Sequence, residues 1–152
     1  MPDKKTIALA KKDKAEGKSA STQAGEFVRA EIDKIRAGKH GARNTKQAIA
    51  IGLSEARRAG VKLKAPEKGK VPEATRKQAK RELAKSPSER AKKPNPRRSR
   101  ATTNALKRES TKPASKAALS KQAKAAARKR SPAQRSASAK KAARTRKARG
   151  GK

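Results

Sequence analysis

The residues best suited to chemistry in this sequence are the lysines and arginines of its last third. Residues 110–152 hold 15 Lys or Arg and no Asp or Glu, and Leu119 is their one large apolar side chain. One cation about every three residues places positive charges along successive phosphates, where binding arises mainly from counterion release. Such a segment buries too little apolar surface to offset its ordering entropy. We therefore expect a long basic arm, largely disordered or transiently helical, that binds a polyanion.

The candidate phosphate contacts are the cations of this arm and of the basic segment before it. Residues 86–100 are rich in Pro, Ser and Arg and are expected to be extended; arginines of such a segment favour the negative potential of an A·T-rich minor groove. The predicted contacts are Arg97, Arg98, Arg100, Lys121, Lys124, Arg128, Lys129, Arg130, Arg135, Lys140, Lys141, Arg144, Arg146, Lys147 and Arg149.

Residue types that support catalysis or metal binding are scarce. The chain has no Cys, and its one histidine, His40, stands between Lys39 and Gly41 without ligand partners in the sequence. The acids Glu26, Glu31 and Asp33 fall on what looks like a charged helix face, and no Ser-His-Asp or Cys-His set exists. We expect no enzyme activity, no metal and no cofactor.

Charge is distributed unevenly along the chain. The net charge is +34, of which residues 1–65 carry +9 and residues 66–152 carry +25. The large aliphatic side chains cluster before residue 65, so we expect one small domain with a basic extension. The predicted organisation is a helical unit at 1–65, a basic linker at 66–100 with one short helix at 72–85, and a Lys/Ala/Arg-rich tail at 101–152.

An all-α fold follows from hydrophobic spacing and from capping residues. Helices are expected at 3–16, 23–37 and 45–59, and weaker ones at 115–130 and 131–149. The second and third form a hairpin, with Gly52 allowing close approach, and its predicted core is Phe27, Val28, Ile32, Ile35, Ile49 and Leu53.

The third helix also presents side chains that read bases. Gln47, Ser54, Arg57 and Arg58 are of the types used for base-edge contacts. The loop before it is longer than the turn of a helix-turn-helix reader, and no dimerisation element is evident. We favour a packing role for this helix.

Two resemblances narrow the origin of the chain. Residues 46–56, KQAIAIGLSEA, resemble the core of a small bacterial family of unknown function, and the likeness covers roughly residues 26–60. Where that family has a Ser-Arg pair, this chain has Asn44 and Thr45. The runs at 115–118, 124–127 and 139–143 resemble the Lys/Ala-rich tails of linker histones and bacterial histone-like proteins, which implies DNA coating.

The leading hypothesis is a histone-like, cytoplasmic protein of a bacterial nucleoid that binds double-stranded DNA without sequence preference. RNA binding, as a ribosome-associated factor or RNA chaperone, is the first alternative. The second is a protein partner at the hairpin, with the tail providing only localisation. No segment has the roughly 20 apolar residues needed to span a bilayer, and we expect no membrane binding.

Overall fold

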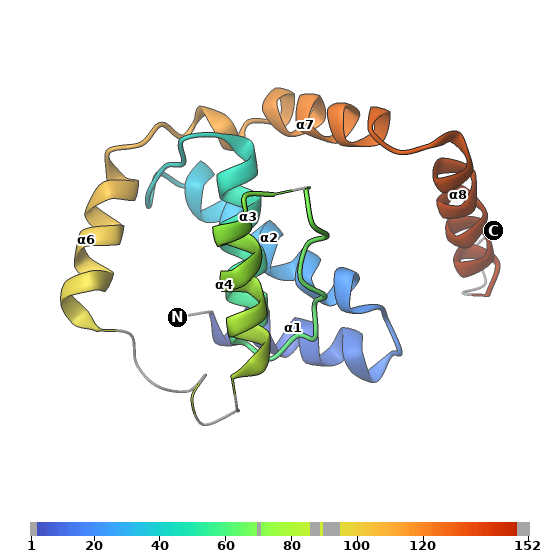
Figure 1. The fold of residues 1–152 in the computed structure, drawn as a ribbon, viewed down its shortest axis with the longest axis horizontal. Helices are drawn as coiled ribbons and strands as arrows, with labels where there is room; N and C mark the ends of the chain where they lie inside the picture. The colour runs from blue at the N-terminus through green and yellow to red at the C-terminus, as the bar shows by residue number, and fades with distance from the viewer. Residues whose placement is uncertain (1–2, 70, 86–88, 90–94, 149–152) are drawn as a thin grey trace. The chain divides into compact units, whose positions relative to one another are not determined.

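The structure is a computed structural model that describes residues 3–69, 71–85, 89 and 95–148. All regular secondary structure in these ranges is helical, which confirms the predicted all-α class (Figure 1). The elements are α1 (Lys4–Ala15), α2 (Ala20–Arg36), α3 (Thr45–Arg58), α4 (Glu73–Ala84), α6 (Pro96–Lys107), the 3-10 helix η1 (Lys112–Ala114), α7 (Lys116–Arg128) and α8 (Pro132–Ala148). The chain forms two compact units, residues 1–115 and 116–152. Whether residues 1–65 fold by themselves stays a prediction.

Side-chain caps fix where the first three helices begin. The carboxylate of Asp3 accepts from the Lys5 amide, and the hydroxyl of Ser19 accepts from the Thr22 amide. The Asn44 side chain accepts from the Gln47 amide at 2.9 Å, while the Gln47 side chain accepts from the Arg43 amide at 2.7 Å. Such caps satisfy amides that have no partner inside the helix.

The hairpin of α2 and α3 is the centre of the first unit. At Gly52, an added Cβ would lie 2.6 Å from the Val28 Cα, so the two helix backbones are in direct contact. This confirms the predicted close approach. Of the predicted hairpin core, Phe27, Ile32 and Ile35 are buried, whereas Val28, Ile49 and Leu53 are half-buried.

The hydrophobic core joins this hairpin to α1 and to the segment that follows α3. Phe27 is fully buried, and Ala10 of α1 and Val61 lie in the same cluster. Ile7 and Leu63 pack against its edge. Residues 61–63, which follow the last helix expected in the 1–65 unit, therefore cover the core.

Helix α4 contacts α3 through a narrow face. Ala79 and Glu82 are buried there, and Pro72 stands at the N-cap with Glu73 next to it. Arg57 of α3 is half-buried, and burial lowers the pKa of its guanidinium, an effect that the nearby Glu82 carboxylate opposes. A base-reading role of Arg57 would need this side chain exposed, whereas Arg58 of the same helix is exposed. The packing role of α3 therefore stays a prediction.

The basic segment around residues 95–107 is not extended, and this corrects the sequence-based expectation for Arg97, Arg98 and Arg100. Asn95 caps α6 by accepting from the Arg97 and Arg98 amides, and Pro96 occupies the first turn, where its missing N–H costs nothing. The Asn-Pro pair is thus a helix start. The earlier part of the predicted extended segment, residues 86–94, lies almost wholly outside the described residues.

Residues 106–114, which we call the strap, return to the hairpin. The amides of Gly41 and Ala42, in the loop between α2 and α3, donate to the carbonyls of Leu106 and Ser110 at 2.8 and 2.9 Å. Ala114, at the end of η1, is fully buried. The first residues of the predicted tail therefore belong to the folded unit.

The second unit consists of α7 and α8, and from here on the name arm refers to this unit, residues 116–152. Ser131 and Gln134 form a reciprocal cap at the start of α8, with backbone–side-chain distances of 3.2 Å in both directions. None of the described residues of either helix is buried. Within the described ranges, no helix combines the length and apolarity required of a membrane span. Helicity of this arm in solution stays a prediction.

Candidate nucleic-acid interface

The described cations that were predicted to contact phosphates are all exposed. Arg97, Arg98 and Arg100 lie on α6, and Arg149 lies outside the described residues. The others lie on α7, on α8 or between these helices: Lys121, Lys124, Arg128, Lys129, Arg130, Arg135, Lys140, Lys141, Arg144, Arg146 and Lys147. Because residues 110–152 contain no Asp or Glu, no acidic side chain within the arm competes with a bound phosphate.

Helix α7 gathers three cations on one face. Lys121, Lys124 and Arg128 are spaced by three and four residues, so they project from the same side of the helix. A shallow, open depression over this face is lined by these three side chains together with Ala117, Ser120 and Ala125. Small side chains between the cations let a polyanion backbone approach the helix closely.

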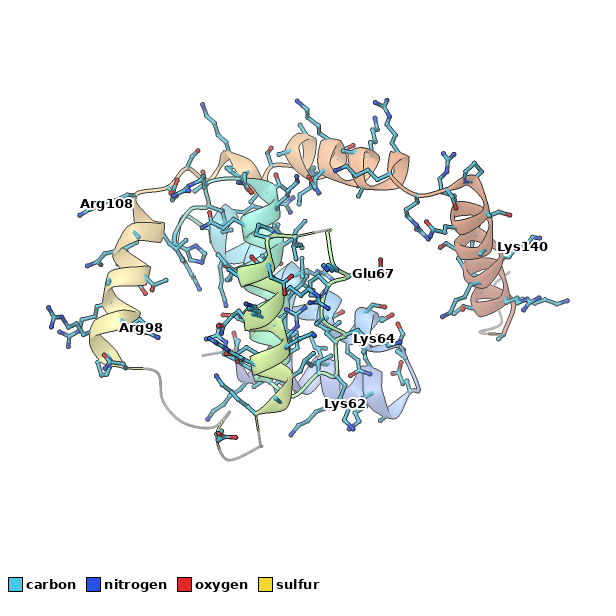
Figure 2. All side chains as sticks on the ribbon, in the orientation of Figure 1. Lys62, Lys64, Glu67, Arg98, Arg108 and Lys140 are labelled. Carbon is cyan, nitrogen blue, oxygen red and sulfur yellow. The ribbon has the colours of Figure 1, made fainter. Side chains whose placement is uncertain are left out.

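Helix α8 distributes its cations around the whole circumference. Arg135 and Arg144 are nine residues apart, about two and a half turns, and so point to opposite sides. Lys140, labelled in Figure 2, projects away from the helix axis. A helix charged on every side can contact phosphates of more than one strand.

Arg130 is exposed, but its side chain also forms hydrogen bonds within the arm. Its guanidinium donates to the Gln134 carbonyl at 3.0 Å and to the hydroxyl of Ser138. These contacts hold the connection between α7 and α8 against the first turns of α8. Arg130 is therefore a structural residue of the arm in addition to a candidate phosphate contact.

The arginines of α6 occupy a helix end where cations are unfavourable. Arg97 and Arg98 stand in the first turn, close to the positive end of the helix dipole. Figure 2 shows Arg98 pointing away from α6 and Arg108 projecting from the turn that follows this helix. An anion bound beside Arg97 or Arg98 would offset the unfavourable interaction of that charge with the helix dipole.

A buried polar cluster in the hairpin was missed by the sequence reading. Glu31, expected on a charged face, has only 1% of its surface exposed. His40 Nε2 lies 3.3 Å from Glu31 Oε1, and Lys34 Nζ lies 3.6 Å from Glu31 Oε2 and 3.3 Å from Glu55 Oε2. His40 is thus paired within the fold. No group of three or more metal-binding side chains occurs in the described part of the chain.

One comparison with known families bears on the helical unit. Residues 11–72 match the model of a family described as "Family of unknown function (DUF6496)". The matched segment runs from within α1 through α2 and α3 to the residue before α4. It agrees with the predicted resemblance of residues 26–60 to a small uncharacterised domain. No curated protein and no solved structure matches the chain.

Proposed function

We propose that this protein binds double-stranded DNA through its arm, by neutralising phosphates without reading sequence. The observation that carries the proposal is the exposure of 12 Lys and Arg side chains across residues 116–148, a stretch that contains no acidic residue. The role is one of binding and not of catalysis. In a bacterial cell its place is the nucleoid, where it coats DNA in a histone-like manner.

The charge density of the arm supports this proposal. From Arg135 to Lys147, α8 carries six cations over 12 residue steps. At about 1.5 Å of rise per residue this is roughly one cation per 3 Å of helix axis. Duplex DNA carries about one negative charge per 1.7 Å of its own axis. An arm laid along the duplex thus neutralises on the order of half of the phosphates beside it.

The side-chain types of the arm argue against base reading. Residues 110–152 contain no aromatic side chain, so stacking on unpaired bases is unavailable. Lysine binds phosphate as a point charge and not through a bidentate contact, so the lysines of the arm give affinity that is nearly independent of sequence. Structured RNA offers the same phosphate chemistry, and it is the alternative that must be tested directly.

The decisive experiment is a salt titration of binding by the full chain to random-sequence duplex DNA, followed by competition with structured RNA. If about ten phosphates are contacted, the logarithm of the affinity falls with the logarithm of salt concentration at a slope near −9. The expected result is this steep slope, with equal affinity for unrelated duplexes. A slope shallower than about −3 would rule out the proposal. Preference for RNA in the competition would mean that the protein is an RNA-binding protein.

A further inference from the structure

The loop between α2 and α3 holds the strap by backbone hydrogen bonds. The Gly41 amide donates to the Leu106 carbonyl at 2.8 Å, and the Ala42 amide donates to the Ser110 carbonyl at 2.9 Å. Both acceptors are separated from the loop by more than 60 residues of chain. These bonds are independent of side-chain identity, so they recognise the conformation of a peptide.

Two side chains extend the same set of donors. Arg36 Nε, in the last turn of α2, donates to the Ala114 carbonyl at 2.8 Å. Thr45 Oγ1, in the first turn of α3, donates to the Pro113 carbonyl at 2.8 Å. Residues 36–45 therefore present four donors to four main-chain carbonyls of the strap. The pair of Arg43 Nε and Glu109 Oε1, at 3.8 Å, adds little because the Arg43 side chain is 79% exposed.

The loop between α2 and α3 and the strap pack against each other without any large side chain. A Cβ added at Gly41 would lie 1.9 Å from the Glu109 carbonyl oxygen and 2.3 Å from its carbon, so backbone rests on backbone. Ala42 and Ala114 are both fully buried in this contact region. A substituent on any of these three residues would push the strap out.

We propose that residues 36–45 form a peptide-binding notch, and that its occupant is this chain's own strap, residues 106–114. All four donors lie inside the family-matched segment 11–72, whereas the strap lies far outside it. The notch takes a peptide that offers carbonyls through a turn and ends in Pro-Ala. By holding Ala114, the notch anchors the chain two residues before Lys116, where the cationic arm begins. This inference does not depend on what the arm binds.

The first test is amide hydrogen exchange, measured by NMR on the full chain. The Gly41 and Ala42 amides are expected to be protected, because both donate to strap carbonyls. Gly41→Ala should speed exchange at Ala42 at least tenfold by removing the strap. Gly25→Ala is the matched control, since a Cβ at Gly25 meets nothing within 4 Å. Unprotected Gly41 and Ala42 amides in the unaltered chain would overturn the proposal.

The second test adds the strap as a separate peptide to a chain whose own strap has been displaced. Ala114→Asp in the full chain puts a charge into a buried site of the strap and leaves residues 36–45 unaltered. A synthetic peptide of residues 104–115 should then bind this variant and restore protection at Ala42. It should bind the unaltered chain at least tenfold more weakly, because the tethered strap competes at high effective concentration.

The controls make either outcome informative. The same peptide carrying Ala114→Asp should not bind, and the peptide should not bind a full chain that carries Gly41→Ala as well as Ala114→Asp. Failure of the unaltered peptide to bind the Ala114→Asp chain, with its helical circular dichroism intact, would overturn the notch. If Ala114→Asp unfolds the chain, the exchange rates of the unaltered chain and of Gly41→Ala still decide whether the strap occupies the notch.

Discussion

The imidazole Nε2 of His40 lies 3.3 Å from the carboxylate Oε1 of Glu31, inside the hairpin and not on its surface. Burial raises the pKa of the Glu31 carboxyl above its usual value of about 4.5, and the neighbouring Glu55 raises it further. The charges of His40 and Lys34 act in the opposite direction and lower this pKa. Burial is the largest of these influences, so the ionised form of Glu31 is disfavoured in the folded state.

Glu31→Gln is expected to remove a pH dependence of stability. A carboxyl with a raised folded pKa binds its proton more tightly in the folded than in the unfolded chain, so its contribution to the free energy of unfolding falls as pH rises from about 4.5 through its folded pKa. The variant and the unaltered chain should therefore differ little in acid, and the variant should be the more stable above that window. Urea unfolding at a series of pH values measures the difference.

Asp33→Asn is the control for this prediction. Asp33 lies on the same helix with 62% of its side chain exposed, so its neutralisation should change the free energy of unfolding by no more than about 0.5 kcal/mol. If Glu31→Gln were less stable than the unaltered chain at neutral pH, the ionised carboxylate would be stabilising, and the assigned direction of its pKa shift would be wrong.

His40→Ala is expected to raise the pKa of Glu31 further. The imidazole is the largest of the influences that lower this pKa, and Lys34 alone would then oppose burial and Glu55. The carboxyl ¹³C chemical shift of Glu31, followed by NMR across pH, reports the change directly. An unchanged or lower pKa in the variant would show that His40 does not stabilise the carboxylate electrostatically.

Gly52→Ala is expected to separate the two helices of the hairpin. The new methyl group would lie 2.6 Å from the Val28 Cα and 2.9 Å from its nitrogen, and neither backbone atom can move aside alone. Overpacking of this kind costs about 1–3 kcal/mol. The midpoint of urea unfolding should fall accordingly, whereas Gly25→Ala should leave it unchanged or raise it slightly, because alanine favours the helix. Equal midpoints for both variants would contradict the observed contact.

Phe27→Ala is expected to remove a large share of the stability of the first unit. Phe27 is the chain's one aromatic residue and is fully buried between α1, α2 and α3. Truncating a buried Phe costs about 3–5 kcal/mol, a large share of the roughly 5–15 kcal/mol by which domains are stable. Leu9→Ala is the matched control, because Leu9 is 43% exposed and should matter by less than about 1 kcal/mol. Thermal unfolding followed by circular dichroism separates the two.

Local signals were sufficient to predict all the described α-helices except α6, and several of their ends. Asp3 and Asn44 cap α1 and α3 as their residue types indicate, and Gly17 and Gly60 end the same helices with positive φ values of 69° and 94°. These features depend on neighbours within a few residues. Two local signals were misjudged. Ser19 caps α2, which begins at Ala20 and not at the expected residue 23. At Asn95-Pro96, capping and first-turn preferences outweigh the extended tendency of a Pro-rich segment.

Contacts between distant residues could not be predicted in this way. The burial of Glu31 depends on the loop that carries His40, and the burial of Gly41 depends on Glu109. Neither pair leaves a periodic signal, because each consists of single residues brought together by the folded chain. The strap in particular lies in the sequence that was predicted as basic tail, and the structure distinguishes it by the donors it meets at residues 36–45.

Neutralising cations of α8 is expected to reduce the salt dependence of DNA binding in proportion to their number. Replacing Lys140, Lys141, Arg144 and Lys147 by Gln removes four exposed charges and should make the slope shallower by about 3.6. The matched control replaces Lys4, Lys5, Lys11 and Lys12, four exposed cations of α1, and so changes net charge equally. Its slope should change by less than about 1, because these lysines lie outside the proposed interface. Equal effects of both quadruple variants would mean that total charge, and not the arm, determines DNA binding.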